Sequence, residues 1–488
     1  RVYPCIASLF NLAGALCLAW TAFDVTVRGR EKPFAVETLP DPHKERLLAP
    51  ANYKLNLKRL DYLLIAGVTV VYSVLAFTNL GSTKAPQTAW TSSAPGETVT
   101  IDLGTEQTFH MTYYGGVSTS TFTVGLSQDG VTWTEPHEAQ FSQGVCFRWL
   151  WYQPGEMSDS GKFTPLQSGY PMQTARYVRL RAERVGLTLH EVAFLDENGA
   201  VLPISGISRD GAAEEFATDF TLLTDEQDTV PPYPSYYNGT YFDEIYHART
   251  AYEHLNGTTA YEWTHPPLGK TLMMIGIELF GMTPFGWRFM GALMGVLMLP
   301  GMYLLVKQLT KRTDLSCIAM ALLALDSMHF TQTRIATIDS YVVFFIMVMY
   351  LFMIRYVQMS FFREPLWKTL VPLGLSGLFM GFAWASKWTG IYASAGLAFL
   401  FFLTVYWRAR EYFCAEDREK VRGFARKLAI TLGCCVVFFV AVPLVIYYYS
   451  YYWQMLPTGG LTVQKVLDLQ ITMFNYHNDL EDTHSFAS

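Results

Sequence analysis

Two adjacent carboxylic acids offer the clearest chemistry in the sequence. Asp243 and Glu244 lie in residues 238–253, where apolar side chains recur at the spacing of a helix. A carboxylate in the first turn of such a helix can accept a proton from a hydroxyl group as a general base. It can equally cap the helix, because Thr240 and Asp243 have the spacing of a capping box. The sequence alone leaves both roles open for Asp243.

A second polar motif, Tyr-Glu-Trp-Thr-His-Pro-Pro-Leu-Gly-Lys at residues 261–270, precedes an apolar segment. Pro266 and Pro267 require an extended entry and favour a helix start. His265 and Lys270 flank that entry. They are candidates for a site, but the motif also fits a plain helix start whose lysine packs its aliphatic stem against apolar surface.

Further ionisable residues stand beside long apolar segments. Arg288 follows Phe-Gly-Trp, Arg334 and Asp339 belong to one short connection, and Lys387 lies in Ser-Lys-Trp-Thr-Gly. A lone arginine beside a membrane helix is usually an interface anchor. Ionisable groups at membrane depth are costly, however, and several together tend to be functional.

The elements that must position these side chains are membrane helices. Of the 488 residues, 51% are hydrophobic and 16% are charged, which excludes a disordered chain, a basic nucleic-acid-binding protein and a disulfide-rich secreted module. A membrane span needs about 20 mostly apolar residues. About eight segments qualify, although Asp326 interrupts the fourth: residues 2–23, 62–83, 289–306, 315–332, 340–354, 369–386, 388–407 and 428–449.

Basic loops orient these spans. Residues 24–60 contain eight Lys and Arg, and residues 307–314, 355–368 and 408–427 are also basic. With eight spans all four loops fall on one side, which the positive-inside rule makes cytoplasmic. We therefore expect a multi-pass cell-membrane protein with residues 81–286 outside. Cys146 is the only cysteine of the outer segment and cannot form an internal disulfide there, which favours a prokaryotic plasma membrane.

Residues 85–204 lose the helical period and alternate short β-prone runs with turn residues. The runs are residues 98–103, 121–126, 177–181 and 189–195, and they predict an all-β sandwich or jelly roll. Four stretches (Val-Thr-Ile-Asp-Leu-Gly, Ser-Gln-Asp-Gly-Val-Thr-Trp, Ala-Arg-Tyr-Val-Arg-Leu and Leu-His-Glu-Val) resemble the discoidin, or coagulation-factor type C, family with its galactose-binding-like fold. The resemblance leaves open whether the module binds a glycan or serves as a spacer or docking domain.

The membrane segments and polar motifs resemble a second family. Phe-Asp-Glu at 242–244, His-Pro-Pro-Leu-Gly-Lys at 265–270, Arg288, residues 325–340 and Ser-Lys-Trp-Thr-Gly at 386–390 are similar to the protein O-mannosyltransferase family. Its members are multispanning GT-C glycosyltransferases that use polyprenyl-phosphate sugars. The resemblance covers residues 60–80 and 235–488, and the β module and the span at 2–23 depart from it.

The resemblance implies roles for individual residues. Asp243 would be the general base of an inverting transfer from a polyprenyl-phosphate sugar, and guanidinium groups can neutralise the departing phosphate bidentately. Such a reaction needs no metal, and the sequence offers no clear metal site or other cofactor. The expected sets are Asp243, Glu244 and His265 as catalytic residues; Arg288, Arg334, Lys270 and Lys387 at the donor phosphate; and Asp339 and His484 in support.

We therefore predict a multispanning, GT-C-like α-helical membrane protein of about eight helices with an inserted extracytoplasmic jelly roll. The chain begins without Met and stops without a terminating feature, so we expect a piece of a longer protein. The predicted divisions are two spans at 1–84, the discoidin-like module at 85–204, a catalytic loop at 205–286, the transmembrane core at 287–450, and the start of a second outer loop at 451–488.

The predicted function is transfer of a sugar, mannose by the resemblance, from a polyprenyl-phosphate donor to Ser or Thr hydroxyls of proteins outside the membrane. One alternative is the same fold glycosylating a lipid or a cell-wall glycan. Another is a glycan-binding membrane sensor or a transporter, but a transporter would place its polar groups at the midplane rather than at the outer boundary. The expected partners are the lipid-linked donor, a protein or glycan acceptor, the bilayer and a glycan for the β module, without nucleic acid.

Overall fold

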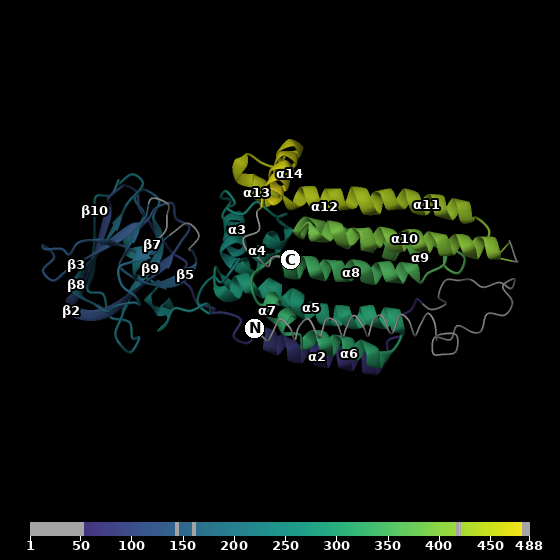
Figure 1. Cartoon of the computed structure of the whole chain (residues 1–488), viewed down its shortest axis with the longest axis horizontal. Coiled ribbons are helices and arrows are strands. Elements are labelled where there is room, and N and C mark those ends of the chain that lie inside the picture. The colour runs from purple at the N-terminus through teal and green to yellow at the C-terminus, as the bar shows by residue number, and fades with distance from the viewer. Residues whose placement is uncertain (1–52, 142–145, 159–162, 416–418, 420, 481–488) are drawn as a thin grey trace.

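The computed structural model describes residues 53–141, 146–158, 163–415, 419 and 421–480. A β domain forms one end of the elongated molecule, and a bundle of long helices forms the other end (Figure 1). Three shorter helices lie where the two parts meet: α3 (Glu244–Leu255), α4 (Leu268–Phe280) and α14 (Val463–Asn478). The candidate residues therefore belong to elements at the junction between an aqueous domain and a membrane bundle.

Six helical stretches in the described part of the chain are long and apolar enough to cross a membrane. They confirm six of the predicted spans, while the predicted span at residues 2–23 lies outside the described residues. The stretches are α2 (Arg59–Phe77), α5 (Pro284–Thr310), α8 (Asp339–Val357), α9 (Leu366–Ser386), α10 (Thr389–Cys414), and Phe424–Ser450, which joins α11 (Phe424–Val436), η4 (Val437–Ala441) and α12 (Val442–Ser450).

The predicted span at 315–332 is two helices rather than one. α6 (Thr313–Ala324) and α7 (Ser327–Thr333) meet at a bend of 59°. Asp326 causes the break, because its backbone is extended and its side chain accepts a hydrogen bond from the Met328 amide at 2.9 Å. The carboxylate thereby starts a new helix, and the two helices together count as a seventh candidate span.

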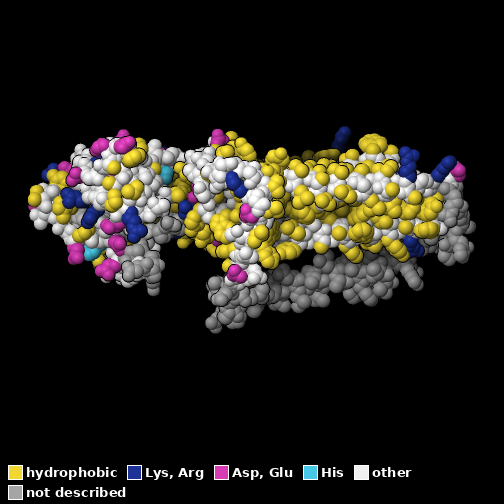
Figure 2. All heavy atoms as spheres, turned by 90° about the horizontal axis from the view of Figure 1, so that it is seen from above, with side chains coloured by type: hydrophobic (Ala, Val, Ile, Leu, Met, Phe, Trp, Pro, Cys, Tyr) yellow, Lys and Arg dark blue, Asp and Glu magenta, His cyan; other side chains and the backbone are white. Residues whose placement is uncertain are grey.

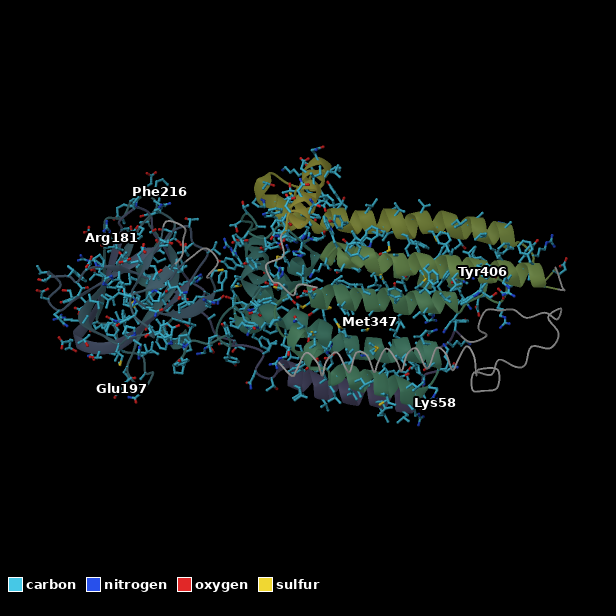
Figure 3. All side chains as sticks on the ribbon, viewed as in Figure 1. Lys58, Arg181, Glu197, Phe216, Met347 and Tyr406 are labelled. Atoms are coloured by element: carbon cyan, nitrogen blue, oxygen red, sulfur yellow. The ribbon has the colours of Figure 1, made fainter. Side chains whose placement is uncertain are left out.

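The surface agrees with a membrane setting. Hydrophobic side chains cover the visible face of the long helices, and charged side chains gather on the β domain and at the opposite end of the bundle (Figure 2). Lys58, beside α2, and Arg181, in the β domain, mark these two ends (Figure 3). Exposed Leu63 and Val71 on α2 are suited to contact lipid rather than water.

The β domain confirms the predicted all-β insertion. The eighteen-residue β2 (Thr98–Gly115) belongs to two antiparallel sheets, because its first half pairs with β8 and β10 and its second half with β5 and β9. Trp90, Phe109, Phe122 and Phe194 are buried in the core. The other strands are β1 (Trp90–Thr91), β3 (Phe122–Ser127), β4 (His137–Glu138), β5 (Arg148–Trp151), β6 (Gly155–Met157), β7 (Phe163–Pro165), β8 (Gln173–Ala182), β9 (Thr188–Leu195) and β10 (Gly206–Asp210).

The β domain is packed onto the helices rather than tethered to them. Tyr114, Phe147 and Trp149 of the β domain share one hydrophobic cluster with Ala248 of α3 and Trp287 of α5. Burial of this shared apolar surface opposes independent motion of the two parts. The β domain consequently helps to hold α3, the helix that carries the acidic pair.

Four short elements remain in the described part of the chain. α13 (Tyr452–Met455) follows the last span, and the 3-10 helices η2 (Phe220–Leu223), η3 (Gln227–Thr229) and η5 (Leu456–Thr458) connect longer elements. His477 near the end of α14 contacts the backbone oxygen of Thr264 at 2.9 Å. This contact brings the predicted second outer loop against the His-Pro-Pro motif.

Candidate functional site

The helix α3 separates the two adjacent acids. Asp243 occupies the N-cap position, but its side chain makes no capping hydrogen bond. Thr240 instead donates its hydroxyl to the backbone oxygen of Cys146 at 2.9 Å, and the Tyr241 amide donates to the Glu244 carboxylate at 2.7 Å. The capping alternative for Asp243 is therefore wrong. The Glu244 carboxylate accepts the hydrogen bond from the Tyr241 amide, and the half-buried Asp243 carboxylate makes no capping hydrogen bond.

Glu244 is buried in an ion pair with Arg288. The guanidinium donates from Nε and Nη2 to the two carboxylate oxygens, both at 2.7 Å. The Ala336 amide also donates to Glu244 at 2.9 Å. Arg288 additionally donates to the backbone oxygens of Leu80, Tyr236 and Gly239. This pair joins the start of α3 to α5, to the end of α2 and to the connection before α8.

Two of the four predicted phosphate-binding cations are buried in such pairs. All three nitrogens of Arg288 donate to protein acceptors, and Lys270 is fully buried. The Lys270 ammonium pairs with the Glu262 carboxylate and donates to the backbone oxygen of His265. The prediction that Arg288 and Lys270 contact the donor phosphate gains no support from this geometry, because both cations are buried and already paired with carboxylates of the protein.

Asp243 lies among ionisable side chains from three other segments. Burial raises its pKa, and the nearby Asp339 carboxylate raises it further, whereas Lys387 and His265 act in the opposite direction. The Lys387 ammonium donates to Asp339 at 2.7 Å, and both side chains remain partly exposed. The fold thus brings together four of the predicted residues: Asp243, His265, Asp339 and Lys387.

Glu262 is a residue of this site that the sequence analysis missed. Its carboxylate lies 3.2 Å from Nδ1 of His265 and 4.0 Å from Nδ1 of His247, in addition to its pair with Lys270. Burial alone would raise the pKa of Glu262, but Lys270, His265 and His247 together outweigh this effect and hold the pKa below its usual range. The signal in the sequence was an acid three residues before His265, within the same motif.

An open pocket of about 370 Å³ lies beside these groups. His265, Lys387, Trp388, Phe474 and His477 are among its lining residues. The His265 and His477 rings meet edge to face, with centroids 5.4 Å apart. A second pocket of about 450 Å³ shares Trp388 and Phe474 and is lined almost entirely by apolar side chains of α9, α10, α12 and α14. A polar pocket and an apolar pocket therefore adjoin at the outer end of the bundle.

Of the two remaining candidates, only Arg334 belongs to the described residues. Arg334 donates to the backbone oxygens of Thr78 and Asn79, both at 2.8 Å, and its guanidinium stacks on the Phe330 ring. It therefore joins the end of α2 to the connection between α7 and α8. His484 lies outside the described residues.

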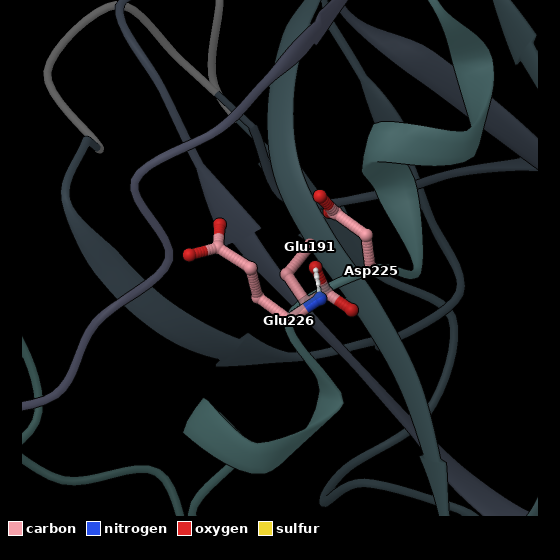
Figure 4. Close-up of side chains that lie close together, drawn as sticks. All are labelled: Glu191, Asp225 and Glu226. Carbon is pink, nitrogen blue, oxygen red and sulfur yellow. Dashed lines mark hydrogen bonds between the residues drawn. The ribbon is translucent and has the colours of Figure 1, made fainter.

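Within the described residues, one acidic group has the spacing of metal ligands, and it lies in the β domain. It consists of Glu191, Asp225 and Glu226 (Figure 4). Glu191 accepts hydrogen bonds from the Glu226 amide and the Gln227 side chain, and Glu226 accepts from the amides of Gln87 and Thr88. The Glu191 and Glu226 carboxylates therefore already accept hydrogen bonds from protein groups. Neither carboxylate belongs to the Asp243 site.

The raised pKa of Glu191 predicts that the stability of the protein depends on pH. Burial raises its pKa to about 8, against 4.5 in an unfolded chain. Between these values the unfolded chain releases the proton and the folded protein keeps it, so stability decreases as pH rises, by about 1.4 kcal/mol per pKa unit at most. We expect the melting temperature to fall between pH 5 and pH 8, and to fall less in Glu191→Gln. Thermal unfolding checks this, with exposed Glu197→Gln as the control (Figure 3); equal slopes in all three proteins would contradict it.

Comparison with known proteins gives a consistent result. Residues 234–456 match the family described as dolichyl-phosphate-mannose-protein mannosyltransferase. A polyprenol-phosphate-mannose–protein mannosyltransferase of Mycobacterium tuberculosis is 31% identical over 174 residues, covering 31% of this chain and 33% of the relative. The enzyme of the same name from Mycolicibacterium smegmatis is 26% identical over 233 residues, covering 43% and 44%.

Two yeast proteins are more distant. The Saccharomyces cerevisiae dolichyl-phosphate-mannose–protein mannosyltransferase 4 is 22% identical over 239 residues, covering 45% of this chain and 30% of the relative. The solved structure of the yeast protein O-mannosyltransferase Pmt1-Pmt2 complex bound to the sugar donor aligns with a TM-score of 0.39 and 20% identity, covering 44% of this chain and 30% of that one. The chain thus covers between 30% and 44% of the length of these curated relatives.

Proposed function

Residues 234–456 carry a domain of the dolichyl-phosphate-mannose-protein mannosyltransferase family, and on this premise we propose that the chain transfers mannose to proteins. The donor is a polyprenyl-phosphate mannose, and the acceptors are Ser or Thr hydroxyls on the extracytoplasmic side. The names of the relatives support this donor and acceptor. The membrane is the plasma membrane of a prokaryote, in keeping with the bacterial sources of the nearer relatives described above.

The observation that carries the proposal is the state of Asp243. Its carboxylate is half-buried, makes no capping bond, and interacts electrostatically with His265 and Lys387, which line the polar pocket. A carboxylate so placed accepts the proton of the acceptor hydroxyl while the hydroxyl oxygen attacks the anomeric carbon. The bond between that carbon and the phosphate oxygen breaks on the opposite face, so the anomeric configuration inverts. The raised pKa makes Asp243 a stronger base than an ordinary aspartate.

Lys387 is the cation best suited to the departing phosphate. Its ammonium is partly exposed, lines the polar pocket and is held by Asp339 at 2.7 Å. The adjoining apolar pocket offers the polyprenyl chain a place between α10, α12 and α14. A monophosphate neutralised by such cations needs no metal ion, and we propose a metal-free reaction. Arg334 is assigned a supporting role, while Arg288 and Lys270 position Glu244 and Glu262.

A donor panel tests the proposed function. The full-length protein in detergent or nanodiscs is offered polyprenyl phosphates carrying mannose, glucose or galactose. The acceptors are Ser/Thr-containing peptides, lipids and cell-wall glycans, and products are identified by mass spectrometry. We expect mannosylated peptide, with activity unchanged by EDTA. Transfer only to lipid or glycan acceptors would replace the proposal with the alternative stated above, and loss of activity in EDTA that magnesium or manganese restores would refute the metal-free reaction.

Lys387→Gln is expected to weaken donor binding. A hydrogen bond to a charged group contributes about 1.5–3 kcal/mol, so the KM for the donor should rise at least roughly tenfold. Lys368→Gln is the matched control, because Lys368 lies in the first turn of α9 whereas Lys387 directly follows its last residue. Steady-state kinetics with varied donor gives both values. An unchanged donor KM in Lys387→Gln would remove Lys387 from the phosphate site.

A further inference from the structure

An exposed row of aromatic side chains leads from the β domain to Asp243. We call Trp151, Tyr233, Tyr236, Tyr241 and Phe242 the aromatic strip. Ring centroids are 5.8 Å apart for Trp151 and Tyr233, 4.7 Å for Tyr236 and Tyr241, and 6.2 Å for Tyr241 and Phe242. Tyr233, Tyr236 and Phe242 are 70%, 60% and 64% exposed. Large aromatic side chains exposed side by side usually mark an interaction site, and this row ends at the residue before the proposed base.

The strip forms one side of a pocket of about 400 Å³ at the β domain. Trp149, Trp151, Tyr170, Tyr233 and Tyr236 line it together with Arg148. The Nε of Arg148 is buried and has no hydrogen-bond partner among the described residues. Arg148 as a whole is only partly buried, and its guanidinium group is a hydrogen-bond donor from which a carbonyl oxygen of a ligand in this pocket can accept.

The backbone under the strip is held in place between Tyr236 and Thr240. A Cβ at Gly239 would lie 2.7 Å from the Cα of Arg148, so only glycine permits this approach to β5. The Thr240 amide donates to the backbone oxygen of Phe147 at 3.1 Å. Arg288 donates to the backbone oxygens of Tyr236 and Gly239, both at 3.0 Å. This part of the strip is therefore a preformed surface, and a ligand can bind to it without first ordering residues 236–240.

The backbone conformation of Phe242 is a further indication that this segment is a binding site. Its φ is +51°, a left-handed conformation that is strained for a bulky residue. The conformation coincides with 64% exposure of the ring directly before Asp243. Strain of this kind persists where the surrounding structure enforces it, often at ligand-binding sites.

We propose that the aromatic strip and its pocket bind the acceptor as an extended, unfolded polypeptide segment. This inference rests on the proposed function, because it assigns the acceptor site of that reaction. An elongated row of rings matches an extended chain, whose carbonyl oxygens can reach Arg148 while a hydroxyl side chain reaches Asp243. Aromatic-lined grooves bind extended, proline-containing chains in this manner. The β domain then selects acceptors by the residues that flank the modified Ser or Thr.

The test compares long and short acceptors in the full-length protein. One peptide carries a single Thr within about 20 residues of unstructured, proline-containing sequence, enough to cover the strip at about 3.3 Å per residue, and the other is the central tripeptide. In Tyr233→Ala/Tyr236→Ala, the KM of the long peptide should rise roughly tenfold relative to that of the short one, as for loss of an aromatic anchor. Phe216→Ala is the matched control, because this ring is 73% exposed on the β domain away from the strip (Figure 3).

A binding measurement separates this inference from the proposed function. Fluorescence anisotropy reports binding of the labelled long peptide without any donor, and we expect the same loss of affinity in the double variant and in Arg148→Gln. Equal peptide affinity in wild type and double variant would overturn the inference even if mannose transfer is observed. Normal peptide binding with no transfer from any donor would overturn the proposed function alone. Displacement of the peptide by a soluble oligosaccharide, or by vesicles of anionic phospholipid, would assign the strip to a glycan or to the membrane and overturn the inference.

Discussion

Asp243→Asn is expected to reduce mannose transfer by roughly 100-fold or more, the contribution of a general base. The amide keeps the size of the side chain but cannot accept the hydroxyl proton. Folding should be unaffected, because the Asp243 carboxylate makes no capping bond. In the wild type, the transfer rate should fall with decreasing pH once the raised pKa of Asp243 is approached, since only the carboxylate is active. Turnover measured at saturating donor and peptide, over a range of pH, checks both statements.

Asp219→Asn is the control for this substitution. Asp219 is an N-cap residue whose side chain does accept a backbone hydrogen bond, at 2.9 Å from the Thr221 amide, and it lies outside the candidate site. Its replacement should leave turnover near that of the wild type. Near-normal turnover in Asp243→Asn, with folding intact, would remove Asp243 as the base.

Arg288→Gln is expected to destabilise the protein by about 3–5 kcal/mol, the usual cost of leaving one partner of a buried ion pair alone. Glu244 would remain fully buried with its bidentate partner gone, and the backbone oxygens of Tyr236 and Gly239 would lose a donor. Unfolding in detergent, followed by intrinsic fluorescence, measures the change. The double variant Arg288→Met/Glu244→Gln should recover part of the loss, because neither buried charge remains.

Arg312→Gln is the matched control, because Arg312 and Asp314 form an ion pair whose side chains are more than half exposed. Exposed pairs of this kind contribute little to stability because water and salt screen them, so the stability of Arg312→Gln should stay near that of the wild type. A stable Arg288→Gln protein with a raised donor KM would instead place Arg288 at the phosphate, as the sequence resemblance implied.

The local pattern of the sequence determined the elements of this protein. Runs of apolar residues marked six membrane helices, and alternation with turn residues marked the strands β2, β3, β8 and β9. These features depend on neighbours within about 20 residues, so they can be predicted from the sequence without knowledge of the tertiary structure. The local pattern did not predict the short strands β1, β4, β5, β6, β7 and β10. It also did not predict the bend at Asp326, where one side chain that accepts a backbone hydrogen bond starts a new helix between two apolar segments.

Only the tertiary structure decided which ionisable groups are available for chemistry. Asp243 and Glu244 are neighbours in sequence, yet the Asp243 carboxylate is half-buried and makes no capping bond while the Glu244 carboxylate is buried against Arg288. Likewise Lys270 is buried against Glu262 whereas Lys387 reaches the polar pocket. Residue type and spacing show that a charge is present. Its burial, its partner and therefore its freedom to act depend on contacts between segments far apart in the chain, which no local pattern records.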